Sequence, residues 1–215
     1  MRRLRRAPLS MLGLNPFVVL ADLSVNLVLV LLFYALGWTL NSSKALELWQ
    51  LQARQTAVEQ ALQGQFPGEL QQGQVRLEVD GNLQRIHFSD NILFDSGRAE
   101  LKDRGQQMLA RLCQVLLATG NRYDTIHIEG HTDNVPIWNS GFHSNWELSS
   151  ARATAVVEFF QTKGVDPGRL VAAGYGEYRP VARNDSPYHK SLNRRIDIVL
   201  AYSQLQSGAA PATAP

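Results

Sequence analysis

The chain has 215 residues, with 21 Lys and Arg against 19 Asp and Glu, five His and one Cys. This near-neutral charge, without an aromatic-rich basic face, argues against a nucleic-acid-binding protein. A single cysteine excludes an internal disulfide and a cysteine-based zinc site. The length and the 45% hydrophobic content fit one modest folded domain with appended segments.

The chain begins with a basic segment, residues 1–16, followed by an apolar run over residues 17–40. As a helix the run would be about 36 Å long, against about 30 Å of hydrocarbon, so we expect one transmembrane helix. Arginines cluster before the run and not directly after it, which predicts a cytoplasmic N-terminus with the remainder on the far side. A cleaved signal peptide is the alternative, but the run is longer than a usual signal core and no small-x-small cleavage site follows it.

Asp22 and Asn26 lie inside this apolar run, four residues apart and therefore on one helix face. A carboxylate in a spanning helix costs a few kcal/mol, so it is retained mainly where it faces a partner, a water-filled path or a proton. The alternative is that Asp22, only about 7 to 8 Å past Phe17, reaches headgroup water at the cytoplasmic edge. We take Asp22 and Asn26 as candidate proton-carrying residues.

Residues 41–73 are expected to form a juxtamembrane helix and a linker. The stretch 43–64 has good helix formers and no proline. Its apolar positions form a thin stripe, suited to packing on a second copy of the chain or along the membrane surface, with a plain spacer as the alternative. Residues 64–74 are rich in Gly and Gln and lack an apolar period, which predicts a linker.

A folded domain is predicted over residues 74–203, followed by a small-residue tail, residues 204–215, that we expect to be disordered. Apolar and polar residues alternate on both sides of Asp80-Gly81, which predicts two strands and a tight turn. Strands alternating with helices at this size predict an α/β (α+β) sandwich, with helices on one face of a mixed sheet. Helices are expected at 99–118 and 145–163, and further strands at 125–131, 169–176 and 196–202.

Several segments of this domain resemble the peptidoglycan-binding domain of the OmpA/MotB family, in that family's order and spacing. They are IEGHTDNVPI, NWELSSARATAVVEFF, GRLVAAGYGEYRPVARN and NRRIDI, preceded by ILFDSGRAEL, which is similar to the family's first strand-to-helix passage. The resemblance covers about residues 83–202. The GHTDNVPI and NWELSSARA segments are closer to the MotB branch than to outer-membrane barrel proteins, and the single predicted spanning helix agrees.

The resemblance implies a ligand, the peptide stem of peptidoglycan, whose diaminopimelate end carries an ammonium and carboxylates in a small volume. Asp133 would accept the ammonium, and the planar guanidinium of Arg152 would bind a carboxylate. A structural Asp133–Arg152 ion pair is the alternative. The resemblance places ligand contacts at Thr132, Asp133, Asn145, Leu148 and Arg152, with Asn134 as a further neutral hydrogen-bonding residue and Arg195 as a weaker addition.

Other chemistries are less well supported by the sequence. His127, Glu129 and His131 would share one face of a strand, but no fourth ligand is visible, so we expect no metal site. No Ser-His-Asp order, nucleophile elbow or phosphate loop is present, so we expect neither an enzyme nor a cofactor. Of Arg194 and Arg195, one is expected to point to solvent, because neighbours on a strand face opposite sides.

In MotB-type proteins, an Ala-Asp pair begins the spanning helix, and its aspartate carries protons through a channel built with a MotA-type partner. This chain has Ala21-Asp22, but Leu20 and Ser24-Val25-Asn26 depart from the branch's usual aromatic and Met-Thr-Ala-like residues. The resemblance implies a subunit of a proton-driven motor or stator, most commonly a flagellar one, in a bacterial inner membrane with a periplasmic domain. Its implied partners are peptidoglycan, a multi-spanning MotA-type protein and a second copy. The alternative is a passive wall-binding anchor without ion transport.

Overall fold

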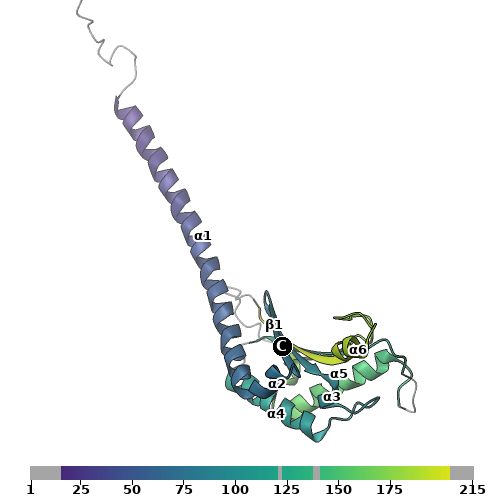
Figure 1. Cartoon of the computed structure of the whole chain (residues 1–215). Helices are drawn as coiled ribbons and strands as arrows, with labels where there is room; N and C mark the ends of the chain where they lie inside the picture. Colours follow the sequence, from purple (N-terminus) through teal and green to yellow (C-terminus); the bar gives the residue numbers. More distant parts are fainter. Residues whose placement is uncertain (1–15, 121–122, 138–140, 204–215) are drawn as a thin grey trace, which may run out of the picture. The chain divides into compact units, whose positions relative to one another are not determined.

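The computed structural model describes residues 16–120, 123–137 and 141–203, and the predicted basic segment before Pro16 and the predicted tail lie outside them. The chain comprises two compact units, Met1–Trp49 and Gln50–Pro215 (Figure 1). The elements in chain order are α1 (Pro16–Gln65), α2 (Pro67–Gln71), β1 (Val75–Asp80), β2 (Leu83–Ser89), α3 (Asp90–Leu93), α4 (Asp103–Ala118), β3 (Thr125–His131), α5 (Asn145–Thr162), η2 (Pro167–Arg169), β4 (Leu170–Gly174), α6 (Pro187–Asn193) and β5 (Arg195–Ala201).

The described part of the first unit is the N-terminal portion of α1. It holds a helical stretch of mean hydropathy 2.0 that is long and apolar enough to cross a membrane, and none of that stretch is buried within the chain. The hydroxyl of Ser24 donates to the carbonyl of Leu20 at 2.7 Å, and Thr39 donates to Leu36 at 2.9 Å. Such bonds satisfy a polar side chain inside its own helix, as an apolar surrounding requires.

Two helices were expected here, with a break near Asn41 and Ser42. The structure has one continuous helix, α1, and both residues lie within it. The end of α1 and the short helix α2 occupy residues 64–71 of the predicted linker, and Phe66 between them extends an apolar stripe of α1. Val58, Leu62 and Phe66 are fully buried at four-residue spacing, and Phe66 lies edge-on to Phe88 with ring centroids 6.2 Å apart. The Gly- and Gln-rich composition concealed this apolar stripe, which ties residues 58–66 into the core of the second unit.

The second unit is built on a five-stranded sheet of order β1-β2-β5-β3-β4. Neighbouring strands are antiparallel except β3 and β4, which are parallel. The predicted hairpin joins β1 and β2 through Gly81 and Asn82, and Gly81 takes a φ of 56°, in the left-handed region that glycine adopts readily. β5 lies at the centre of the sheet, and its residues are buried on both faces.

The helices α4 and α5 supply one face of the core. Leu109, Leu112 and Leu116 of α4, with Val156 and Phe160 of α5, join the alternate apolar residues of the strands in one buried cluster. The predicted α/β sandwich is therefore confirmed. The first of these helices begins at Asp103 instead of residue 99, since an isolated bridge between Phe94 and Leu101 holds the intervening residues outside the helix.

Two glycines set how closely α5 approaches the sheet. Gly130 of β3 and Gly174 of β4 are paired across the parallel ladder. A Cβ on Gly130 would collide with the carbonyl oxygen of Ser149, and one on Gly174 would collide with the side chain and backbone of Ser150. Because neither glycine carries a Cβ, the first turns of α5 lie directly on the ends of β3 and β4.

Replacing Phe66 by alanine should lower the free energy of unfolding of the second unit by about 3 to 5 kcal/mol, because a fully buried aromatic side chain is lost. Urea unfolding of the full chain in mild detergent, followed by near-ultraviolet circular dichroism, measures this. Gln60→Ala is the control, since Gln60 is exposed on α1, which ends at Gln65 just before Phe66. Equal stability of the two variants would contradict the packing of residues 58–66 in the core.

Candidate functional site

A cavity of about 650 Å³ lies where the end of β3, the first turns of α5 and the segment after β2 meet. The closeness of α5 to the sheet brings its residues to this corner. The structure thereby brings together five of the residues that the sequence singled out. They are Thr132, Asp133, Asn145, Leu148 and Arg152.

Arg152 forms the floor of the cavity, with a side chain only 3% exposed. Its Nε donates to the carbonyl of Arg98 at 2.8 Å, and its Nη2 donates to the carbonyl of Asp95 at 3.2 Å. Its Nη1 lies 3.0 Å from Oδ1 of Asp90. The guanidinium also lies over the ring of Phe94, 5.2 Å from the centroid. Arg152 thus fastens α5 to residues 90–98.

Asp90 is the counter-charge of Arg152, and it is not among the residues predicted from the sequence. Burial raises the pKa of Asp90 to about 6, although the charges of Arg152 and Arg194 act to lower it. Its Oδ1 contacts Nη1 of Arg152 without the alignment of a hydrogen bond. The sequence near Asp90 shows only an acidic residue after an alternating strand. Nothing there indicates a pairing with Arg152, which is remote in the sequence.

Asp133 lies in the same cavity but pairs with a different arginine. Its Oδ2 lies 2.5 Å from Nη1 of Arg194, and its Oδ1 accepts the backbone N–H of Val135 at 3.0 Å. The alternative of an Asp133–Arg152 ion pair is therefore not what the structure forms. The side chain of Arg194 is 41% exposed, whereas that of Asp133 is 8% exposed. Arg194 is therefore the member of this pair that another cation can replace.

Asn145, the first residue of α5, holds the loop after β3. Its Nδ2 lies within hydrogen-bonding distance of the carbonyls of Asp133 (3.3 Å) and Val135 (3.1 Å) and of Oε2 of Glu177 (2.8 Å). Thr132 donates its hydroxyl to the carbonyl of Asp133 at 2.9 Å, and Leu148 is buried below. These residues fix the position of the Asp133 carboxylate.

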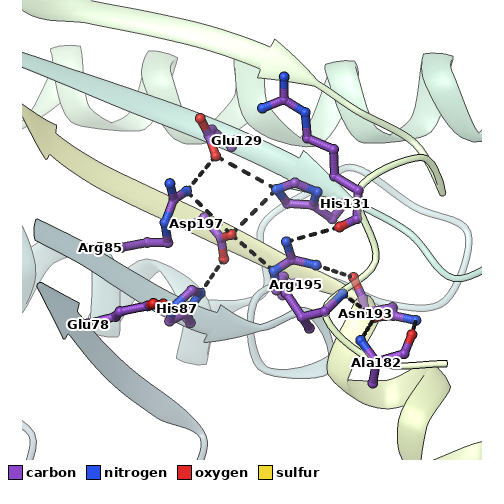
Figure 2. Close-up of polar contacts among 11 residues, drawn as sticks. Glu78, Arg85, His87, Glu129, His131, Ala182, Asn193, Arg195 and Asp197 are labelled. Carbon is purple, nitrogen blue, oxygen red and sulfur yellow. Dashed lines mark hydrogen bonds and ion pairs between the residues drawn. The ribbon is translucent and has the colours of Figure 1, made fainter. Parts of the chain in front are cut away.

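Two of the expected contacts do not lie in this cavity. Asn134 is exposed and does not line it. Arg195 is buried on the sheet, where its Nε lies 3.0 Å from Oδ2 of Asp197 (Figure 2). The neighbouring Arg194 takes the place in the cavity wall that was expected of Arg195. Neighbouring residues at the start of β5 face opposite sides of the sheet. The sequence did not decide which of the two arginines faces the cavity.

Figure 2 shows the charged cluster around Asp197 that holds Arg195. Nδ1 of His87 lies 2.7 Å from Oδ1 of Asp197, and Arg85 lies 2.7 Å from Glu129. Burial alone would raise the pKa of Asp197, but the hydrogen bond with His87 and the charge of Arg195 lower it overall. The cluster locks β2, β3 and β5 together on the sheet face opposite α4 and α5.

Glu129, His131 and Asp197 of this cluster place their potential metal-ligating atoms within 4.8 Å of one another. Burial lowers the pKa of His131, so its ring is neutral and suited to metal binding. However, the carboxylates of Glu129 and Asp197 already face Arg85 and Arg195. Two guanidiniums oppose a divalent cation at the same oxygens, and the donor set therefore fits ion pairs better than a metal.

The fold and the cavity define an OmpA-like α/β sandwich domain that follows a long apolar helix. Residues 93–194 match the model of the OmpA family. Motility protein B of Bacillus subtilis is 38% identical over 116 residues, which are 54% of this chain and 44% of that protein. The chain spans about half the length of the curated relatives it matches.

Two solved structures share the fold of this chain. A MotB-like protein from Desulfovibrio vulgaris is 28% identical with a TM-score of 0.66, and the match covers 74% of this chain and 99% of that one. The cell wall anchor of the T6SS from Pseudomonas aeruginosa is 29% identical with a TM-score of 0.61, and the match covers 66% of this chain and 97% of that one.

The pKa of Asp90 predicts how the cavity responds to pH. Because its folded pKa, about 6, lies above the ordinary 3.8, Asp90 gains a proton in the folded state as the pH falls from 7.5 to 5.5. Arg152 then loses its counter-charge, and its affinity for a carboxylate should rise about 3- to 10-fold. No histidine is among the described residues that line the cavity.

Calorimetric titration of the full chain in detergent with diaminopimelate, at both pH values, checks this expectation. Asp90→Asn is the matched variant, since it removes the titration while keeping the shape of the side chain. It should bind at pH 7.5 as tightly as the wild type binds at pH 5.5. An affinity that is independent of pH in the wild type would show that Asp90 does not compete for Arg152.

Proposed function

We propose that the domain binds the peptide stem of peptidoglycan in the Arg152 cavity. We further propose that the chain is a MotB-like subunit of a proton-driven motor, anchored to the wall from the inner membrane. Its N-terminus would be cytoplasmic and its domain periplasmic. Its partners would be a second copy and a multi-spanning MotA-type protein. The proposal gives the cavity a binding role and no catalytic one.

One observation carries the binding proposal: a buried guanidinium and a buried carboxylate line the same cavity, each with its own partner. A diaminopimelate end offers a carboxylate for Arg152 and an ammonium for Asp133. The ammonium can replace Arg194 at Asp133, because the Arg194 side chain is the more exposed member of that pair. Charge-assisted hydrogen bonds of this kind are shorter and stronger than neutral ones.

The apolar helix supports the second half of the proposal. Asp22 and Asn26 are exposed on α1, and among the described residues neither side chain has a hydrogen-bonding or ion-pair partner. A lipid environment makes such groups costly, so we expect them to face a water-filled path between helices. One charge crossing 100 mV supplies about 2.3 kcal/mol, which is enough to drive conformational work. Asp22 would then carry the proton, with Asn26 one turn away.

A passive wall anchor is the second candidate. The similarity to the cell wall anchor of the T6SS is nearly as strong as that to the MotB-like protein from Desulfovibrio vulgaris, so the domain alone does not distinguish the two roles. The polar face of α1 favours the motor subunit, because a tether has no use for Asp22 and Asn26 in lipid.

Asp133→Asn should weaken binding to isolated peptidoglycan about 10-fold or more, since a charge-assisted hydrogen bond to the ligand ammonium is lost. Co-sedimentation of the full chain in detergent with purified wall measures this. Asn134→Ala is the control, because Asn134 is exposed and outside the cavity. Sedimentation of Asp133→Asn at the wild-type level would count against the cavity. Arg152→Ala is a weaker test, because it leaves Asp90 buried without a counter-charge and lowers stability as well.

Asp22→Asn should abolish proton transport while the protein stays in the membrane, because the amide cannot take up and release a proton. The measurement is acidification of vesicles that contain the chain with its co-purified partner, under an imposed membrane potential. Ser24→Ala serves as the control, since the Ser24 hydroxyl is already bonded within its own helix. Transport at the wild-type rate by Asp22→Asn would leave the passive anchor as the better account.

A further inference from the structure

A second cavity, of about 340 Å³, adjoins the Arg152 cavity and shares Asn91 and Arg194 with it. Its walls come from the connection between α2 and β1, from β1 and β2, and from α6. All of these elements belong to the second unit. A ligand bound in the first cavity can therefore extend past Arg194 into the second cavity.

The second cavity is cationic. Its described lining includes three arginines, Arg76, Arg194 and Arg195, together with His87, and it includes no Asp or Glu. The carboxylate partners of Arg194 and Arg195, Asp133 and Asp197, lie outside this lining, so the wall of the cavity itself presents guanidiniums. A lining of this kind is therefore typical of a site for an anionic group.

The donors of these side chains are not equally available. Arg195 is committed to Asp197 and to the carbonyls of Asn193 and Arg179. The two ring nitrogens of His87 face Asp197 and Glu78. Arg195 and His87 therefore have few donors left for a ligand.

Arg76 and Arg194 are the available donors. Among the described residues, the Arg76 side chain has no hydrogen-bonding or ion-pair partner. Arg194 uses one terminal nitrogen, Nη1, on Asp133 and keeps its remaining donors. A planar guanidinium presents five N–H groups, so Arg194 has donors for the second cavity whether Nη1 stays on Asp133 or a ligand ammonium replaces it there.

We propose that the second cavity binds the free α-carboxylate of the glutamyl residue that precedes diaminopimelate in the stem peptide, through Arg76 and Arg194. This inference rests on the proposed binding of the stem peptide in the Arg152 cavity. The glutamyl residue is joined to diaminopimelate through its side chain, and its α-carboxylate stays free. Because the two cavities share Asn91 and Arg194, a carboxylate next to the bound diaminopimelate residue can enter the second cavity. The domain would then discriminate against walls in which this carboxylate is amidated.

The test compares two synthetic tripeptides, alanyl-γ-glutamyl-diaminopimelate and the same peptide with the glutamyl α-carboxylate amidated. Each is titrated calorimetrically into the full chain in detergent at pH 7.5. The wild type should prefer the free acid about 5- to 10-fold, as expected for one additional charge-assisted contact. Arg76→Gln should weaken binding of the acid to the level of the amide and leave the amide unchanged. Arg183→Gln is the charge-matched control, because Arg183 is exposed and lines neither cavity.

Equal affinity of the wild type for both peptides, or an unchanged preference in Arg76→Gln, would overturn the assignment of the second cavity and leave the first intact. Failure of both peptides to bind the wild type would overturn the proposed function together with this inference. Inorganic phosphate is the remaining probe. If phosphate binds in an Arg76-dependent manner more tightly than the free-acid peptide, the site belongs to a phosphate-bearing polymer or headgroup and the carboxylate assignment is wrong.

Discussion

The buried guanidinium of Arg152 is the constraint on which the rest of the site depends. A charge that is 3% exposed must be compensated on every side, and Asp90 and the carbonyls of Asp95 and Arg98 provide this compensation. These contacts join the middle of α5 to the segment after β2 and so create the cavity floor. Removing Arg152 would leave the Asp90 carboxylate buried without a counter-charge, at a cost of about 3 to 5 kcal/mol. A ligand carboxylate can enter because Asp90, with a pKa near 6, is a counter-charge that is close to being neutralised.

The backbone of the sheet prepares this arrangement. Gly130 and Gly174 let α5 lie on the ends of the parallel strands, which brings Asn145 and Arg152 to the loop that carries Asp133. On the opposite face, the cluster around Asp197 buries Arg195 and thereby leaves the preceding Arg194 at the wall between two cavities. One face of the sheet is thus apolar and packed. On the other face, the ion pairs fix which arginine is buried against the sheet and which one lines the cavities.

The sequence predicted the elements whose signal is local. The strand alternation, the helices α4 and α5 and the sandwich all follow from periodicity, and the family resemblance singled out five residues that share one cavity. Asp90 and Arg194 were missed because their partners, Arg152 and Asp133, are about sixty residues distant and no local pattern announces the pairing. The packing of Phe66 was missed for a different reason, since Gln and Gly between the apolar positions suggested a linker.

The central claim is that the stem peptide binds against the guanidinium of Arg152. The most direct measurement is nuclear magnetic resonance of the full chain in detergent micelles, titrated with the free-acid tripeptide, in which the side-chain Nε–H signal of Arg152 is followed. The account predicts that this signal shifts with the peptide, together with the backbone amides of Asp133 and Asn145. If the peptide binds and these three signals stay in place while others move, the ligand lies elsewhere and the account is wrong.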